Sequence, residues 1–423
     1  MKFRVDHDAL ADAVGWVARA LPTRPVVPVL SGLKLEAGDS GLSLSCFDYE
    51  LSATARISAD VVEPGTALVP GRLLAEIVRS LPGQPAEFTT DNDVVLLTCG
   101  SAEFELVALP LADYPAPPAA PPAAGTVDGG ELAAAIGQVL PAASRDDTLP
   151  MLTGVCFDID GATMTLAATD RYRLAVRELV WAPARPGLRA AALVPARTLA
   201  DAARGMGPGV TVTIAFTPGD PDGTGAEARG APRPAEGMIS FESAGRRLAT
   251  RLIAGEFIRY QSRFPASFGC RADVPAASFI EAVRRVSLVA DRASPVRLTF
   301  GGGTVAIEAA TEGRARAVEK VTASFHGDQP VIAFNPHYLL DGLAAAAAGD
   351  PAREPADGGE QAAGAAKGRP VPSQAAIRMD FTSPAKPALI TRADPGSGHP
   401  ADAGEAATRF RYLVVPLRPP SGT

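Results

Sequence analysis

The stretch FRVDHDALADAV at residues 3–14 decides the fold, because two altered copies of it occur later in the chain. The second copy is GTVDGGELAAAI at 125–136, and the third is RADVPAASFIEAV at 271–283. Each copy places an apolar strand residue five positions before the first of two apolar helix residues, which are themselves four apart. The residues are Val5, Leu10 and Val14 in the first copy, Val127, Leu132 and Ile136 in the second, and Val274, Phe279 and Val283 in the third. Each copy therefore predicts a short strand followed by an amphipathic helix. In the first helix the apolar stripe continues through Val17 and Leu21.

A second unit follows in every copy. LVPGRLLAEIVRSLP at 68–82 parallels LVPARTLADAARGMG at 193–207 and AFNPHYLLDGLAAA at 333–346. Strand-like segments with alternating apolar residues follow each of these predicted helices. Each copy therefore contains two successive units, and each unit consists of a strand, a helix and further strands. The chain therefore predicts an α+β fold of three repeated domains, each with two helices and antiparallel sheets.

The starts of the repeats set the predicted domain boundaries, which are 1–122, 123–266 and 267–423. A Pro/Ala-rich stretch at 115–125 is typical of a semi-rigid linker between the first two domains. Three further segments carry no apolar period, and we expect them to be long loops: 217–237, 349–373 and 393–407. Insertions of this kind cost little entropy at the surface of a domain.

The overall charge limits the kinds of partner. The chain has 423 residues, a net charge of −7 and an isoelectric point near 5.3. This balance argues against a protein coated in nucleic acid, but it permits a basic surface confined to one face. Four scattered cysteines and four histidines form no ligand pattern, so we expect no metal site. The N-terminus lacks an apolar signal core and no long apolar run occurs, so we expect no membrane segment. Scattered single cysteines suit a reducing environment, so we expect a cytoplasmic location.

Arginines recur at matched positions of the second helices. Arg72 and Arg79 are seven residues apart, so two helical turns set them on one face. Arg197 and Arg204 hold the same places in the second copy. The opposing stripe of the first of these helices is formed by Leu73, Ile77 and Leu81. Two interpretations fit these arginines: solvated helix faces, or a shared basic surface that contacts phosphates without reading bases.

Motifs of catalysis are missing from the sequence. No phosphate-binding loop of the GxxxxGK[ST] or GxGxxG type occurs, and no Ser/His/Asp arrangement or carboxylate pair stands out. The GGG at 301–303 lies between two strand-like segments and predicts a hairpin turn, as does Asp91-Asn92-Asp93. The sequence therefore names no catalytic residue and no cofactor.

The repeats, together with TDRYRLA at 169–175 and YLVVPLR at 412–418, resemble the bacterial DNA polymerase III beta subunit family, the sliding clamps. Family-like segments also occur in RPVVPVLSGLKLEA at 24–37, LVPGRLL at 68–74 and LPLADYP at 109–115. The similarity covers essentially the whole chain outside the predicted loops, and the order and spacing of the motifs over three repeats carry it.

The resemblance implies a processivity factor without an active site or cofactor. Two chains would close head to tail into a six-domain ring, with helices lining the hole and sheets outside. The ring would encircle double-stranded DNA without sequence specificity. It would tether the DNA polymerase III alpha subunit, the clamp loader and other proteins that carry a clamp-binding motif.

Two sets of site residues follow from the resemblance. The residues expected to face DNA are Arg24, Arg72, Arg79, Arg197 and Arg204. The residues expected to form a peptide-binding cleft are Leu152, Thr169, Arg171, Tyr172, Arg173, Leu174, Leu413, Val414, Val415, Pro416, Leu417 and Arg418. In this cleft Leu and Val would hold apolar peptide anchors, and arginine would hydrogen-bond peptide carbonyls or acids.

The chain departs from the family pattern at a few positions. Ile258 stands where the family usually has proline, Phe47-Asp48 replaces the usual Thr-Asp, and the tail PPSGT follows the last strand. Two alternatives therefore stay open. One is a specialised clamp paralogue with an altered cleft, tolerant of an inhibitor or dedicated to repair, and the other is an enzyme on a triplicated scaffold.

Overall fold

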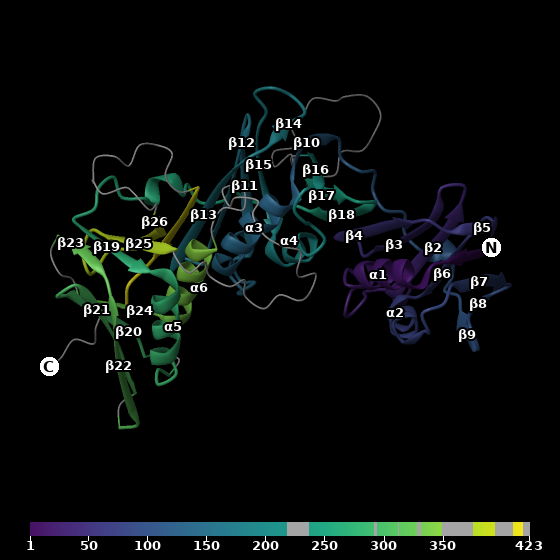
Figure 1. Cartoon of the computed structure of the whole chain (residues 1–423). Coiled ribbons are helices and arrows are strands. Elements are labelled where there is room, and N and C mark those ends of the chain that lie inside the picture. Colours follow the sequence, from purple (N-terminus) through teal and green to yellow (C-terminus); the bar gives the residue numbers. More distant parts are fainter. Residues whose placement is uncertain are drawn as a thin grey trace. The chain divides into compact units, whose positions relative to one another are not determined.

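The computed structural model describes residues 1–217, 237–291, 294–311, 313–327, 331–348, 375–393 and 409–417 (Figure 1). The chain divides into two compact units. Unit 1 comprises Met1–Gly129, Ala182–Pro186 and Arg197–Ala254, and unit 2 comprises Gly130–Trp181, Gly187–Ala196 and Gly255–Thr423. Both units combine helices with antiparallel sheets, which confirms the α+β class, and the described residues contain six α-helices.

Two sequence predictions are not decided by this division. It runs through the second repeat, so the domain boundaries at 122/123 and 266/267 stay predictions. The expected loops at 217–237, 349–373 and 393–407 lie outside the described residues, apart from Thr217, Gly237 and Ala393.

The first sheet of unit 1 has five strands in the order β5-β1-β7-β8-β9. They are β1 (Lys2–Val5), β5 (Asp60–Glu63), β7 (Ala86–Asp91), β8 (Val94–Cys99) and β9 (Ala102–Val107). Asn92, at φ +50°, makes the turn between β7 and β8, which confirms the predicted Asp-Asn-Asp turn. Strand β9 lies at one edge of the sheet, where in the described part of the chain no strand pairs with its outer side.

The second sheet of unit 1 has nine strands in the order β14-β10-β16-β17-β18-β4-β3-β2-β6. They are β2 (Gly32–Gly38), β3 (Gly41–Phe47), β4 (Leu51–Ile57), β6 (Gly65–Pro70), β10 (Ala123–Asp128), β14 (Ala182–Pro183), β16 (Thr211–Thr217), β17 (Met238–Ser243) and β18 (Arg246–Arg251). The pairing of β18 with β4 sets Arg247 opposite Thr54. Strands of the first and second repeats therefore share one continuous sheet.

Helix α1 (His7–Ala18) packs against β3 and β4 of this sheet (Figure 1). It begins after Asp6, whose side chain accepts a hydrogen bond from the backbone N–H of Ala9 at 3.0 Å. The predicted apolar stripe of Leu10, Val14, Val17 and Leu21 is buried, as the helical period requires.

Helix α2 (Gly71–Ser80) packs against α1 and against β2 and β6. Its buried residues are Gly71, Leu74 and Val78, whereas the side chain of Leu73 is 46% exposed. The expected stripe of Leu73, Ile77 and Leu81 was therefore wrong at Leu73, whereas Leu81 is buried as expected. Leu74 turns toward the sheet instead, and Leu73 is left on the surface.

Unit 2 also contains a nine-stranded sheet, in the order β15-β11-β12-β13-β27-β26-β25-β19-β23. Its strands are β11 (Gly154–Asp160), β12 (Thr163–Thr169), β13 (Arg173–Val180), β15 (Arg189–Pro195), β19 (Cys270–Pro275), β23 (Ser324–His326), β25 (Ala376–Phe381), β26 (Ala388–Ala393) and β27 (Phe410–Val414). Strand β27, the last strand within the described ranges, thus lies between a strand of the second repeat and a strand of the third.

The remaining sheet of unit 2 has the order β22-β21-β20-β24. Its strands are β20 (Val296–Gly301), β21 (Thr304–Thr311), β22 (Ala315–Thr322) and β24 (Val331–Phe334). Gly302 and Gly303, at φ +58° and +74°, turn the chain between β20 and β21. This confirms the predicted glycine hairpin, since two successive positive φ angles suit glycine. Strand β22 is an edge strand, like β9.

Three helices belong largely to unit 2: α3 (Gly129–Val139), α5 (Ala276–Ser287) and α6 (Pro336–Ala347). Helix α6 begins after Asn335, whose side chain accepts a hydrogen bond from the backbone N–H of His337 at 2.9 Å. Gly342 lets this helix approach β27 closely, because a Cβ atom there would lie 2.4 Å from the ring of Tyr412. No helix in the described part of the chain is long and apolar enough to cross a membrane.

Candidate functional sites

The turn between β12 and β13 contains the first group of predicted cleft residues. Side chains within this turn hold its backbone in place. The Thr169 hydroxyl donates to the carbonyl of Arg173 at 2.6 Å and accepts from the N–H of Arg171 at 3.2 Å. Asp170 accepts from the N–H groups of Tyr172 and Arg173 at 3.0 and 3.1 Å. These bonds keep Arg171 at φ +80°, a left-handed conformation that is costly for a residue with a Cβ atom. Tyr172 is 52% exposed at the tip of the turn.

Strands β13 and β27 bring the turn together with the end of the chain. Leu174 lies opposite Leu413, and both side chains are buried. The pairing continues beyond the strand, where the N–H of Val415 donates to the carbonyl of Tyr172 at 2.8 Å. Val415 and Leu417 are 36% and 37% exposed, so an apolar surface beside Tyr172 remains open to solvent.

The other expected cleft residues differ in burial and in their distance from the turn. Val414, the last residue of β27, and Pro416, two residues beyond it, are both buried. Leu152 is buried in the short 3-10 helix η4 (Pro150–Leu152), which precedes β11, two strands away from β13 in the sheet. Arg418 lies outside the described residues.

Arg173 differs from its expected role, because its guanidinium is already engaged within the protein. Its Nε donates to Asp170 at 2.9 Å and its Nη1 to Asp341 of α6 at 2.5 Å. The guanidinium carbon lies 4.4 Å from the ring centroid of Tyr338, and the side chain is only 10% exposed. Such an arrangement fixes the turn to α6, and the Nε and Nη1 donors of Arg173 are used within the protein.

Sequence reasoning missed the residues of α6 that hold Arg173. Tyr338 stacks on Tyr172 with ring centroids 6.1 Å apart, and its carbonyl accepts from the hydroxyl of Tyr412 at 2.8 Å. Burial raises the pKa of the Tyr412 hydroxyl, which keeps it protonated and able to donate this bond. Asp170 lay within the TDRYRLA segment, three residues before Arg173, but no pattern in the sequence links α6 to that segment.

The predicted DNA-facing arginines of the first repeat are all exposed. Arg72, in the first turn of α2, donates through Nη2 to the carbonyls of Leu21 and Pro22 at 3.2 and 3.3 Å. These bonds tie α2 to the segment that carries Arg24. Arg79 lies in the last turn of α2, where a cation also complements the helix dipole. The first repeat therefore brings Arg24 and Arg72 into one neighbourhood.

The arginines of the second repeat are arranged differently from the sequence expectation. Arg197 is exposed in the first turn of α4 (Ala196–Ala203). Arg204 lies one residue beyond the end of this helix, so the two are not spaced on one helical face as expected. Arg204 also forms an ion pair with Asp201 at 3.1 Å, which offsets part of its charge.

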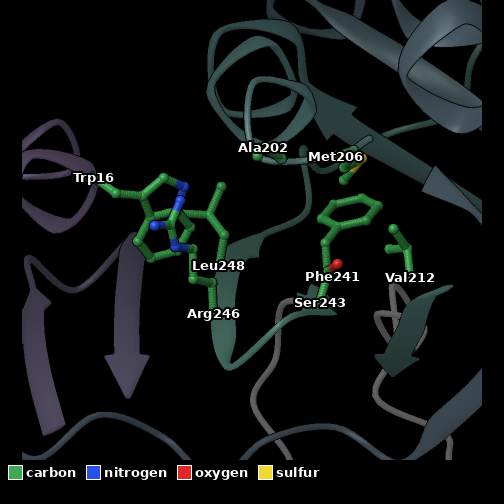
Figure 2. A pocket seen from close by; sticks show the side chains of 9 residues that line it. Trp16, Ala202, Met206, Val212, Phe241, Ser243, Arg246 and Leu248 are labelled. Atoms are coloured by element: carbon green, nitrogen blue, oxygen red, sulfur yellow. The ribbon is translucent and has the colours of Figure 1, made fainter. Parts of the chain in front are cut away.

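A small crevice lies where α1, the end of α4 and strands β16 to β18 meet in unit 1 (Figure 2). Trp16 lies beside Arg246, whose guanidinium carbon is 5.6 Å from the indole centroid and which also pairs with Asp12. Met206 and Phe241 are on its far side. This contact holds α1 of the first repeat against strands of the second.

The comparisons with known proteins agree in every repeat. The N-terminal, central and C-terminal domains of the DNA polymerase III beta subunit match residues 1–118, 126–258 and 261–350. The chain belongs to the DNA polymerase III beta subunit family. The chain is also 46% identical to the beta sliding clamp of Streptomyces coelicolor, over 99% of both chains. It is 42% identical to the beta sliding clamp homolog GriR of Streptomyces muensis, over 81% of this chain and 88% of that protein.

Solved structures of clamps share the fold. The sliding clamp of Bacillus subtilis superposes with a TM-score of 0.80 at 24% identity, over 99% of both chains. A clamp of Pseudomonas aeruginosa bound to griselimycin gives a TM-score of 0.80 at 23% identity, with the same coverage. Together these matches establish three clamp domains and a replication factor of the sliding-clamp type, which is a processivity subunit and not an enzyme. The roles of the individual arginines and cleft residues remain predictions.

Proposed function

We propose that two copies of this chain close head to tail into a ring around duplex DNA, and that each copy presents one peptide cleft to the polymerase. Family membership supports DNA and polymerase as partners. The observation that carries the ring is a pair of open sheet edges with opposite charge, β9 in unit 1 and β22 in unit 2.

Strand β9 presents an acidic and apolar edge. Glu103, Glu105 and Val107 alternate along one side of the strand and are exposed, Val107 by 69%. An open edge strand of this kind is a template for pairing with another chain. Since β9 bears acids and not lysines, it is suited to a basic partner strand and is protected against a second copy of itself.

Strand β22 presents the complementary edge. Arg316, Val318 and Lys320 alternate along its exposed side, with Val318 exposed by 47%. An antiparallel register that sets Val107 opposite Val318 also sets Glu105 opposite Lys320, so one apolar pair and one ion pair coincide. A second copy supplies the matching edge, and two such interfaces close a ring of two chains.

The inner surface of the ring would carry the arginines. Exposed Arg24, Arg79 and Arg197 can pair with phosphates, and Arg72 and Arg204 contribute less because they are engaged in part within the protein. Contacts of this kind do not read bases and weaken with salt, which suits a protein that moves along DNA.

The cleft would take a short linear peptide with apolar anchors. Tyr172, Val415 and Leu417 supply exposed apolar surface at a rigid turn, so little ordering is needed when a peptide binds. The expected ligand is a segment of the Gln-x-x-Leu-Phe type from the polymerase, the clamp loader or repair proteins.

We further propose that the protein works in the cytoplasm.

Peptide binding tests this function directly. A fluorescein-labelled Gln-Ser-Asp-Leu-Phe peptide is titrated with the full chain and followed by anisotropy. Leu417→Glu places a charge in the apolar surface and lowers the affinity at least about tenfold, whereas Val180→Glu, on the exposed far end of β13, changes it little. Equal binding by the two variants would contradict the assignment of the cleft.

A further inference from the structure

A groove on the open face of the nine-stranded sheet of unit 1 has no role in the proposed function. Its volume is about 470 Å³, and it is lined by β2, β3, β4 and β6 and by the segment 111–117 that follows β9. None of its lining residues belongs to the predicted DNA-facing arginines, the two edge strands or the peptide cleft. The volume falls in the range of about 300–1,000 Å³ that is usual for ligand sites.

Short hydroxyl side chains form the floor of the groove. They are Ser43 and Ser45 on β3, Ser52 and Thr54 on β4, and Thr66 on β6. None of these hydroxyls is hydrogen-bonded to another of the described residues, so all five are available to a ligand. Their small size also keeps the groove open where longer side chains would fill it.

Arg56 supplies an unpaired positive charge at one end of this floor. It lies directly opposite Ser43 in the β3–β4 register, and Thr54 lies two residues before it on the same face. The guanidinium of Arg56 makes no ion pair within the described ranges. By contrast, the other cation of the groove, Lys34, is paired with Glu36 at 3.1 Å.

The segment 111–117 gives the groove an apolar wall. Leu111, Pro115, Ala116 and Pro117 line it, beside Tyr114. The Tyr114 hydroxyl accepts a hydrogen bond from the N–H of Phe47 at 2.7 Å, and its ring packs on the buried cluster around Leu68. The wall is thereby fixed to the sheet before any ligand arrives, which reduces the entropy lost on binding.

We infer that this groove binds an acidic peptide segment of a partner protein, with a carboxylate on Arg56 and an apolar side chain against the 111–117 wall. One free guanidinium matches one carboxylate in a bidentate pair, whereas a phosphate dianion would leave charge unmatched. The four lining strands span about 14 Å at ~4.8 Å per strand, which is the length of about four extended residues. The floor hydroxyls would bond to the backbone of those residues.

Methyl NMR on the full-length protein tests this site without a known partner. The chain is labelled at leucine, valine and alanine methyl groups and titrated with Ac-Leu-Ser-Glu-Leu-NH2. We expect saturable shifts at Leu111 and Ala116, with no comparable shifts at Leu413 and Val415 of the cleft. Replacing Glu by Gln in the peptide weakens binding about fivefold, the effect of one exposed ion pair.

Arg56→Gln should weaken binding of the Glu peptide by the same factor. The matched control is Arg4→Gln, which alters an exposed arginine in the other sheet of unit 1 and should leave the affinity within about twofold. The inference is overturned if Leu111 and Ala116 do not respond, or if the Gln peptide or the Arg56 variant binds as well as the parent. Tighter binding of a phosphoserine peptide than of the Glu peptide would overturn the choice of a carboxylate.

Discussion

Charge reversal on the two edge strands separates a head-to-tail ring from any other dimer. One chain carries Glu103→Lys and Glu105→Lys on β9, and the other carries Arg316→Glu and Lys320→Glu on β22. Each chain alone would oppose like charges at both of its interfaces. In a mixture, each reversed edge meets the complementary edge of the other chain, so both interfaces of the mixed ring are attractive.

The expected size of the effect follows from the exposure of these side chains. In the proposed register Glu105 faces Lys320 once at each interface, so a ring of two identical reversed chains contains two such pairs, and at each an attraction of about 0.5 kcal/mol becomes a repulsion of similar size. The total is about 2 kcal/mol, or roughly thirtyfold in the dissociation constant. High salt should shrink the difference, because exposed charges are screened.

Sedimentation equilibrium measures the outcome. The parent chain should sediment at about twice 43.5 kDa, each reversed chain should shift toward 43.5 kDa, and the equimolar mixture should return to the dimer mass. Asp60→Lys with Glu63→Lys on β5, the opposite edge of the same sheet as β9, is the matched control and should remain dimeric. Two reversed chains that stay dimeric alone, or a mixture that does not recover, would refute the pairing of β9 with β22.

Three further substitutions probe other parts of the protein. Arg171→Gly relieves a positive φ angle and should stabilise the fold by about 0.5–1 kcal/mol in thermal melting; an unchanged midpoint would remove the claim of strain. Arg173→Met breaks the links to Asp170 and Asp341 and should cost about 2 kcal/mol of stability, given partial exposure, while lowering peptide affinity; unchanged affinity would show that the turn holds itself. Arg79→Glu with Arg197→Glu should shorten retention on nicked circular DNA at moderate salt without altering the dimer mass, and an equal lifetime would count against a basic lining.

The repeat pattern predicted the six helices and the short strand that precedes the first helix of each copy. Val5, Leu10 and Val14 repeat at one spacing in three places, and periodicity of this kind depends only on local geometry and burial. The hairpin turns at Asn92 and Gly302 were also predictable, because their conformations favour particular residue types. The phase of α2 was misjudged, because Leu73 and Leu74 are both leucine and only packing decides which one is buried.

The pairing of strands and side chains that are far apart in the chain could not be predicted from the sequence. Nothing in the residues of β4 and β18 indicates that they join two repeats in one sheet. Likewise, the sequence alone does not show whether the guanidinium of Arg173 faces a peptide or Asp341. Its contact depends on α6, a helix far along the chain. The cleft residues were therefore predicted from the family motif and stay a prediction, while the contacts that hold Arg173 could be seen only in the fold.

Retention on circular and linear DNA tests the central claim most directly. The protein is loaded onto nicked circular duplex DNA by a clamp loader and separated from free protein by gel filtration, before and after the circle is cut once. A closed ring should stay on the circle and be lost from the linear product, because it can slide off the ends. Equal retention on both forms would contradict a topological ring and would indicate ordinary surface binding.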